Sequence, residues 1–326
     1  MALTLWDTTG ADIIHALLAE RRTAGALASG LALTLVVVVD EKRVREAEEA
    51  ATVAAAAHPC RVLIVVRHSI EAEIRLDAEV QVGGRLGATE AVVMRMYGRL
   101  ALHAESVVLP LLAPDAPVVT WWHGEPPEEI ATDALGVFAG RRITDCAQAA
   151  DPIAALRQRA NDFVAGDTDL SWTRATPWRS LLASAMDGVT NKATSAKVGA
   201  EAGNPSAPLL AGWLTSRLGV EATVEETKGP GITNVDIMTT DDDDAEYPIT
   251  ISRPSGTTAT LNRGDQDCRS LPLARRGLGD LLAEELRRMD TDPIYAEALS
   301  TATGVRVDEE AASRVLVWRD PALAAK

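Results

Sequence analysis

The sequence predicts an α/β fold: a mixed sheet with flanking helices in an N-terminal domain, and a smaller α+β C-terminal domain with an antiparallel meander covered by helices. Two apolar runs, 31–39 and 62–66, are separated by a helix-length segment, which is typical of a βαβ unit. Short alternating runs separated by turn residues fill much of the second half. The length of 326 residues suits two domains, each with its own core.

The N-terminal domain is predicted to span residues 1–200. Its run 31–39 is apolar on both faces, so we expect a central strand that is covered on both sides. The following segment, 41–57, has a small-residue face and is expected to be a helix that ends at His58-Pro59. Further strands are predicted at 72–82 and 118–122, and 91–97 is either a further strand, which we favour, or a short helix. Further helices are expected after Thr9 and at 105–112, 130–138 and 152–163.

The C-terminal domain is predicted to span residues 201–326, after a linker at 191–208 that is rich in Ala, Gly, Ser, Lys and Pro. A helix is expected at 208–218, ended by Gly219. The meander is predicted from strands at 222–227, 232–239, 247–253, 257–262 and 268–273. A helix at 278–289 is expected to cover the meander, and Asp292-Pro293 begins one more.

Composition excludes several classes of protein. The net charge of −15 argues against binding to nucleic acid or to an anionic membrane. The longest apolar run is too short for a membrane-spanning helix, and the N-terminus lacks the pattern of a signal peptide. Cys60, Cys146 and Cys268 lie far apart and form no CxxC pair, so we expect a cytoplasmic protein without a disulfide framework.

No sequence pattern indicates catalysis. The phosphate loop, the zinc-protease motif, the nucleophile elbow and the dinucleotide fingerprint are all missing, so we predict no catalytic residue, no cofactor and no metal site. Three weaker signals favour ordinary structure. Gly83, Gly84 and Gly87 suit a turn better than a phosphate loop. The run 241–244 suits a hairpin tip better than a cation site, and Cys60 an inert buried thiol better than a reactive one.

The segment 169–179 concentrates two Trp/Arg pairs in a chain that has few aromatic residues. Leu170, Trp172 and Arg174 alternate as in a short strand, and Thr176-Pro177 is typical of a helix start. We therefore expect a strand-to-helix turn, where the helix N-terminus favours anions. Two interpretations remain open: an exposed anchor for a partner, or a structural latch with buried tryptophans and internally paired arginines.

Two further stretches are candidate recognition sites. In Trp121-Trp122, one ring should enter the core and the other face outward, because side chains alternate along a strand. The outward ring would be a protein contact or a stacking platform. Arg141-Arg142, with Asp145 nearby, either forms an ion pair that orients a helix end or takes part in recognition.

An ordered set of motifs extends along nearly the whole chain. In the first part they are His58-Pro-Cys-Arg61, 105–112, 118–122, 141–145 and 169–179, and in the second part 212–219, Ile251-Ser-Arg-Pro254, 282–288 and 295–299. In this order they resemble the glucose-6-phosphate dehydrogenase assembly protein family, OpcA, and its actinobacterial branch most closely.

The resemblance implies a non-catalytic assembly factor or allosteric activator. Such a protein binds glucose-6-phosphate dehydrogenase, favours its active oligomeric form and supports the oxidative pentose phosphate pathway. A tenfold shift of the equilibrium between the inactive and active forms of the dehydrogenase needs only ~1.4 kcal/mol of differential binding, which one or two well-packed anchors can supply. The expected anchors are Trp121, Trp122, Arg141, Arg142, Trp172, Arg174, Trp178 and Arg179.

Two other functions stay open. The first is a sugar-phosphate- or nucleotide-binding sensor or enzyme that uses the Arg/Trp cluster at a helix N-terminus. The second is a structural scaffold in another complex.

Overall fold

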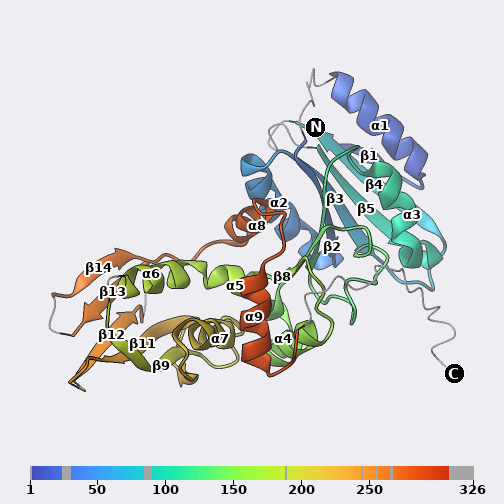
Figure 1. Cartoon of the computed structure of the whole chain (residues 1–326). Coiled ribbons are helices and arrows are strands. Elements are labelled where there is room, and N and C mark those ends of the chain that lie inside the picture. The colour runs from blue at the N-terminus through green and yellow to red at the C-terminus, as the bar shows by residue number, and fades with distance from the viewer. Residues whose placement is uncertain are drawn as a thin grey trace, which may run out of the picture.

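The computed structural model describes residues 2–23, 31–83, 90–187, 189–243, 245–254, 256–264 and 267–307. It confirms the predicted fold class: an eight-stranded and a six-stranded sheet, each with flanking helices (Figure 1). No helix among the described residues is both long enough and apolar enough to cross a membrane.

The eight-stranded sheet has the order β1-β4-β5-β3-β2-β6-β7-β8. Strand β2 is central, as its apolar run predicts, and pairs in parallel with β3 and β6, while β4 runs antiparallel to β1 and β5. The strands are β1 (Leu3–Leu5), β2 (Leu33–Val39), β3 (Cys60–Arg67), β4 (Arg75–Val82), β5 (Glu90–Tyr97), β6 (Val118–His123), β7 (Arg141–Thr144) and β8 (Asp167–Asp169).

Alternate residues of β2 enter different cores, because successive side chains of a strand point to opposite faces. Val36 packs in the core that includes α1 (Gly10–Thr23) and α3 (Ala104–Val108). Leu35 and Val37 pack in the core that includes α2 (Val44–Ala57) and α8 (Leu278–Leu286). Both faces of the sheet are therefore covered.

Helix α8 corrects one prediction, because it does not cover the meander. Its Leu281, Leu282 and Leu286 pack with the alanine face of α2, and the two helices lie side by side (Figure 1). The contact is close: a Cβ on Gly279 would lie 2.5 Å from Cβ of Val53. The C-terminal part of the chain thus completes the core of the first sheet.

The segment 130–138 also differs from its prediction, since it forms turns and no helix. The carbonyl of Asp133 accepts hydrogen bonds from the amides of both Gly136 and Val137. A Cβ on Gly136 would lie 1.8 Å from the carbonyl oxygen of Ile130, so the chain folds back on itself here. The predicted helix at 105–112 divides into α3 and a 3-10 turn, whereas that at 152–163 forms as α4 (Pro152–Asn161).

The six-stranded sheet has the order β10-β9-β11-β12-β13-β14. Its last four strands form an antiparallel meander as predicted, but 222–227, the first strand predicted for the meander, lies outside it and pairs in parallel with β9. The predicted linker at 191–208 is wrong, because 192–201 is strand β9, which is parallel to β10 and antiparallel to β11. The strands are β9 (Lys192–Glu201), β10 (Ala222–Thr227), β11 (Ile232–Thr240), β12 (Glu246–Ser252), β13 (Thr258–Arg263) and β14 (Arg269–Pro272).

Helices α6 (Thr176–Met186) and α7 (Ser206–Leu218) bury the apolar face of this sheet. The last described helix, α9 (Pro293–Thr303), begins with the predicted cap, in which Asp292 accepts from the amide of Tyr295, and it packs on α7. The predicted domain boundary at residue 200 falls inside β9, and the division into domains stays a prediction.

Candidate functional site

The segment 169–179 joins the two sheets, and its first half is helical. The predicted strand at Leu170–Arg174 is wrong, since these residues form helix α5. Asp169 caps this helix by accepting a hydrogen bond from the amide of Ser171 at 2.8 Å. The other carboxylate oxygen of Asp169 accepts from Oγ1 of Thr144 and from the amide of Cys146. Asp169 therefore fixes the end of β7 to the start of α5.

The predicted helix start at Thr176-Pro177 is confirmed as α6, with one change in its cap. The N-cap position is Ala175, which makes no side-chain cap. Oγ1 of Thr176 instead accepts a hydrogen bond from Arg179 at 2.9 Å. The structure therefore has two short consecutive helices here, α5 and α6.

Trp172 and Trp178 are 1% and 2% exposed. Nε1 of Trp172 donates to Oδ2 of Asp292 at 2.9 Å, and the guanidinium of Arg179 lies 3.4 Å from the centre of the Trp172 ring. Burial lowers the pKa of Arg179 to about 10. The burial of both rings favours the latch interpretation, and contact of these residues with a partner stays a prediction.

Trp121 and Trp122 are 0% and 1% exposed, so the prediction that one ring faces outward is wrong. Strand β6 lies inside the sheet, and both of its faces are covered. Trp121 packs in the core of β2, α2 and α8, whereas the Trp122 ring is beside Gly136 in the turn segment.

Arg142 is fully buried and paired inside the chain. It forms a salt bridge with Asp167 of β8, and it donates to the carbonyls of Ala139 and Ala165 at 2.8 Å each. Asp167 also accepts from the amide of Val164 at 2.8 Å. Burial raises the pKa of Asp167, and the charge of Arg142 opposes that rise. This arginine joins two neighbouring strands.

Arg141, which is 2% exposed, links β7 to α8. It donates to Glu285 at 2.5 Å and to the carbonyl of Asp290 at 2.7 Å. The other oxygen of Glu285 accepts from Oγ1 of Thr173 in α5 at 2.6 Å. Glu285 therefore connects three elements, and Arg276 adds contacts to Glu284 and to the carbonyl of Thr173.

Arg174 makes a two-pronged salt bridge with Asp145, at 2.6 and 2.7 Å. Burial raises the pKa of Asp145, and the hydrogen bonds from Arg174 oppose that rise. The sequence placed Asp145 next to Arg141 and Arg142, but both of those arginines pair with other carboxylates. We call this set of paired side chains the latch: Arg141, Arg142, Trp172, Arg174 and Arg179 with Asp145, Asp167, Glu285 and Asp292.

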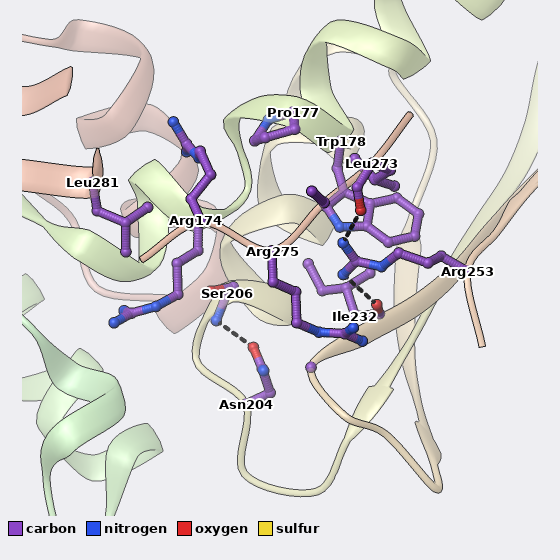
Figure 2. Close-up of a pocket in the computed structure, with 13 residues that line it drawn as sticks. Arg174, Pro177, Trp178, Asn204, Ser206, Ile232, Arg253, Leu273, Arg275 and Leu281 are labelled. Atoms are coloured by element: carbon purple, nitrogen blue, oxygen red, sulfur yellow. Dashed lines mark hydrogen bonds between the residues drawn. The ribbon is translucent and has the colours of Figure 1, made fainter. Parts of the chain in front are cut away.

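Five of the eight predicted site residues lie at two separate cavities. A groove of about 630 Å³ has mixed charge and includes Arg141, Trp172 and Arg179 among its lining residues. A second cavity, of about 180 Å³, brings Arg174 and Trp178 together with Arg253, Arg275 and Arg276 (Figure 2). Trp121, Trp122 and Arg142 line neither cavity.

Three residues of interest were missed by the sequence analysis. Arg253 and Arg275 follow strands β12 and β14. In the sequence, Arg253 is marked only by the following Pro254 and Arg275 only by the following Arg276, and neither pattern indicates a binding site. Trp6 follows the edge strand β1 and is 74% exposed, the largest fraction among the exposed large hydrophobic side chains of the described chain. A single exposed tryptophan has no signature in the sequence.

The weaker signals have structural explanations. Cys60 is buried, and burial raises the pKa of its thiol to about 12, which makes it unreactive as predicted. Asp241 accepts hydrogen bonds from the amides of Asp243 and Ala245 and from the hydroxyl of Tyr247, as expected at a hairpin tip. Asp244, Gly84 and Gly87 lie outside the described residues. The described part of the chain contains no group of three or more side chains that could hold a metal ion.

The carboxyl ends of β2 and β6 form the switch point of the first sheet, where open α/β folds place their ligands. Asp40 and Glu41 directly follow β2. Glu41 accepts from Arg95 at 2.9 Å, and the ring of the buried His123 lies 3.1 Å from a carboxylate oxygen of Glu46. Carboxylates therefore occupy the position where dinucleotide-binding folds present glycine backbone.

The fold and this site define a two-sheet α/β protein in which Arg141, Arg142 and Arg174 of the latch form salt bridges with buried carboxylates of the same chain. Residues 51–161 match the model of the glucose-6-phosphate dehydrogenase subunit N-terminal domain, and residues 165–299 match that of the C-terminal domain. The chain belongs to this glucose-6-phosphate dehydrogenase assembly family, OpcA, as the motifs predict.

No curated protein matches the chain. Among solved structures it is similar to KijD10, a 3-ketoreductase from Actinomadura kijaniata, at 10% identity and a TM-score of 0.41, over 84% of this chain and 95% of that one. It is also similar to an NAD binding oxidoreductase from Klebsiella pneumoniae, at 10% identity and a TM-score of 0.42, over 87% and 96% of the two chains. This likeness is too low to assign a fold or a function.

Proposed function

We propose that this chain is a non-catalytic protein that binds glucose-6-phosphate dehydrogenase and favours its active oligomeric form. It would act in the cytoplasm as an assembly factor or allosteric activator and support the oxidative pentose phosphate pathway. The observation that carries the proposal is the match of both halves of the chain, 51–161 and 165–299, to the two domains of one family.

The switch point of the first sheet supports a non-catalytic function. A bound dinucleotide would place its pyrophosphate near the end of β2, where backbone amides and a helix N-terminus normally receive it. Here the connection from β2 to α2 is Asp40-Glu41-Lys42-Arg43, which contains no glycine, so it lacks the residues that let a backbone approach a pyrophosphate closely.

The partner surface has to be sought outside the latch, because the predicted tryptophan anchors are buried. We assign it to the exposed edge of the first sheet, where β1 is the terminal strand. Trp6 is 74% exposed and Ile74 is 68% exposed. A hydrogen bond of 2.7 Å from the amide of Thr8 to the carbonyl of Leu76 joins the segments that carry them. Exposed aromatic residues are the commonest energetic anchors of protein interfaces.

The mechanism requires only a modest difference in affinity. A protein that binds the active oligomer better than the inactive form shifts that equilibrium by the ratio of the two affinities and by no more. One anchor of about 2 kcal/mol, if it engages only the active form, shifts the equilibrium about thirtyfold.

The test mixes the chain with its dehydrogenase and measures co-elution by size-exclusion chromatography with light scattering, together with the apparent affinity for glucose 6-phosphate. Trp6→Ala and Ile74→Asp are expected to weaken the complex at least tenfold. Val224→Asp is the matched control, because Val224 is 47% exposed on β10, at the edge of the other sheet. The proposal fails if the unaltered chain changes neither the oligomer distribution nor the substrate affinity.

A further inference from the structure

The cavity of about 180 Å³ between α5, α7 and the loops after β12 and β14 has an unusual charge. Among the described residues it is lined by four arginines and by no carboxylate, although the chain as a whole carries a net charge of −15 (Figure 2). Its lining residues are Arg174, Pro177, Trp178, Asn204, Ser206, Gly231, Ile232, Arg253, Leu273, Ala274, Arg275, Arg276 and Leu281.

The four arginines fall into two pairs. Arg174 and Arg276 are already neutralised, by Asp145 and by Glu284. Arg253 and Arg275 form no salt bridge with any carboxylate of the described chain, and both donate only to main-chain carbonyls. The cavity therefore contains two positive charges that no carboxylate of the described residues pairs with.

Arg253 is the more unusual of these two. It is 5% exposed, and its Nε has no hydrogen-bond partner within the part of the chain that the structure describes. It donates to the carbonyls of Leu273 and Ile232 at 2.6 and 3.2 Å, and its guanidinium lies 5.1 Å from the centre of the Trp178 ring. Its pKa falls to about 10, mainly through burial and further through the charge of Arg275. A buried cation beside a second cation is costly without an anion.

Arg275 is an exposed lining residue of the cavity. It donates to the carbonyls of Pro230 and Gly256 at 2.7 and 3.2 Å, and these hydrogen bonds hold its side chain in place. Helix α7 begins beside the cavity, where Oδ1 of Asn204 accepts a hydrogen bond from the amide of Ser206 at 2.9 Å. The helix therefore adds the positive end of its dipole, although the amide of Ser206 is already occupied.

We propose that this cavity binds a small phosphate-bearing molecule, with Arg253 and Arg275 as its cationic ligands. The planar guanidinium matches the geometry of a phosphate group and donates two parallel hydrogen bonds to it. The volume of about 180 Å³ is below the ~300 Å³ of a pocket for a drug-sized ligand, so the ligand is inorganic phosphate or a small phosphate monoester.

This site does not depend on the proposed partner function. Arg253 and Arg275 lie at the second sheet, whereas the assigned partner surface lies at the edge of the first. Phosphate binding can be measured with the chain alone, so failure of one proposal is distinguishable from failure of the other.

The experiment is isothermal titration calorimetry of the full chain at constant ionic strength. Inorganic phosphate, glycerol 3-phosphate and glycerol are the three probes. Saturable binding of phosphate or of glycerol 3-phosphate, with none of glycerol, is expected, and the stronger of the two identifies free phosphate or a monoester as the natural class. The absence of saturable binding by both phosphate probes at millimolar concentration overturns the proposal.

Variants locate the site. Arg275→Ala is expected to weaken binding at least tenfold. Arg263→Ala is the matched control and is expected to bind normally, because the one hydrogen-bond partner of Arg263 among the described residues is also a main-chain carbonyl, that of Ser184. Arg253→Lys keeps the buried charge but loses the planar guanidinium and its two parallel hydrogen bonds. It should therefore weaken phosphate binding, while the circular dichroism spectrum of the variant stays unchanged. Equal binding by Arg275→Ala and the unaltered chain would also overturn the proposal.

Discussion

Two arginine-rich regions of this chain lie next to each other and differ in the groups that pair with their arginines. In the latch, Arg141, Arg142 and Arg174 each form a salt bridge with a carboxylate. In the neighbouring cavity, Arg253 and Arg275 have only main-chain oxygens as partners among the described residues. Both regions contain a tryptophan with an arginine over its ring, Trp172 in the latch and Trp178 in the cavity.

The difference separates structural arginines from ligand-binding ones. A buried arginine that forms a salt bridge with a carboxylate has its charge neutralised, and removal of either partner destabilises the fold. A buried cation that has only carbonyls keeps an unbalanced charge, and an anion from solution can complete it. The Trp/Arg composition is the same in both regions, so composition alone does not reveal which function a region has.

The largest expected effect is in the latch. Glu285→Ala leaves Arg141 buried without its carboxylate and removes the acceptor of Thr173, so it should lower the free energy of unfolding by about 3–5 kcal/mol. Urea unfolding measures this change. Glu297→Ala breaks the exposed pair with Arg217 and should cost less than about 1 kcal/mol. Equal losses in the two variants would show that the latch is no stronger than a surface pair.

The next prediction tests whether every paired arginine has an ionised partner. Asp162 lies 3.1 Å from Arg159, yet burial, its largest influence, raises its pKa from 3.8 to about 7. Because the folded chain then binds this proton more tightly than the unfolded chain, the stability that Asp162 contributes is present below about pH 4 and is lost as the pH rises to about 7.

Asp162→Asn mimics the protonated form and should remove this dependence. The stability of the original chain relative to this variant is expected to fall between about pH 4 and pH 7 by a few kcal/mol, at most about 4 kcal/mol. Parallel curves from chemical unfolding over this range would show that Asp162 is ionised, like an ordinary ion-pair partner.

A carboxylate introduced into the cavity should make it resemble the latch. Ala274 lines the cavity between Leu273 and Arg275. In Ala274→Glu the new carboxylate should pair with Arg253 and Arg275. It should raise the free energy of unfolding by up to about 1 kcal/mol and weaken phosphate binding at least tenfold. Ala274→Gln is the uncharged control. Normal phosphate binding by Ala274→Glu would contradict an electrostatic role for the cavity.

The smallest effect is expected at the edge of the latch. Arg179 stacks on Trp172 and donates to Thr176, without a salt bridge to a carboxylate within the described ranges. Arg179→Met keeps the apolar stem and loses the cation, so it should cost about 0.5–1 kcal/mol in thermal unfolding. A loss as large as that in Glu285→Ala would place Arg179 among the structural arginines.

The sequence predicted the elements whose signals are local. The β2–α2–β3 unit, the meander and the helix starts at Pro177 and Pro293 formed where periodicity and capping residues placed them. Strand β9 was missed because its Ala- and Gly-rich composition resembles a linker. Small residues are needed there: a Cβ on Gly199 would lie 2.1 Å from Oδ1 of Asn234 on the neighbouring strand.

Long-range partners could not be predicted. The apolar face of α8 suits either sheet, and only the fold shows that it packs on α2. Arg141 finds its carboxylate 144 residues away, at Glu285, although Asp145 is close in sequence. Trp121 and Trp122 are both buried because both faces of β6 are covered. The alternation of side chains along one strand does not reveal whether its sheet is covered on one face or on both.

Hydrogen–deuterium exchange of the chain with and without its dehydrogenase tests the central claim most directly. That claim is that the Trp/Arg segment holds the two sheets together, while the partner binds at the edge of the first sheet. Added protection is expected at residues 3–8 and 70–82, around Trp6 and Ile74, with no change at 170–179. Protection confined to 170–179, with unchanged exchange at the sheet edge, would contradict it.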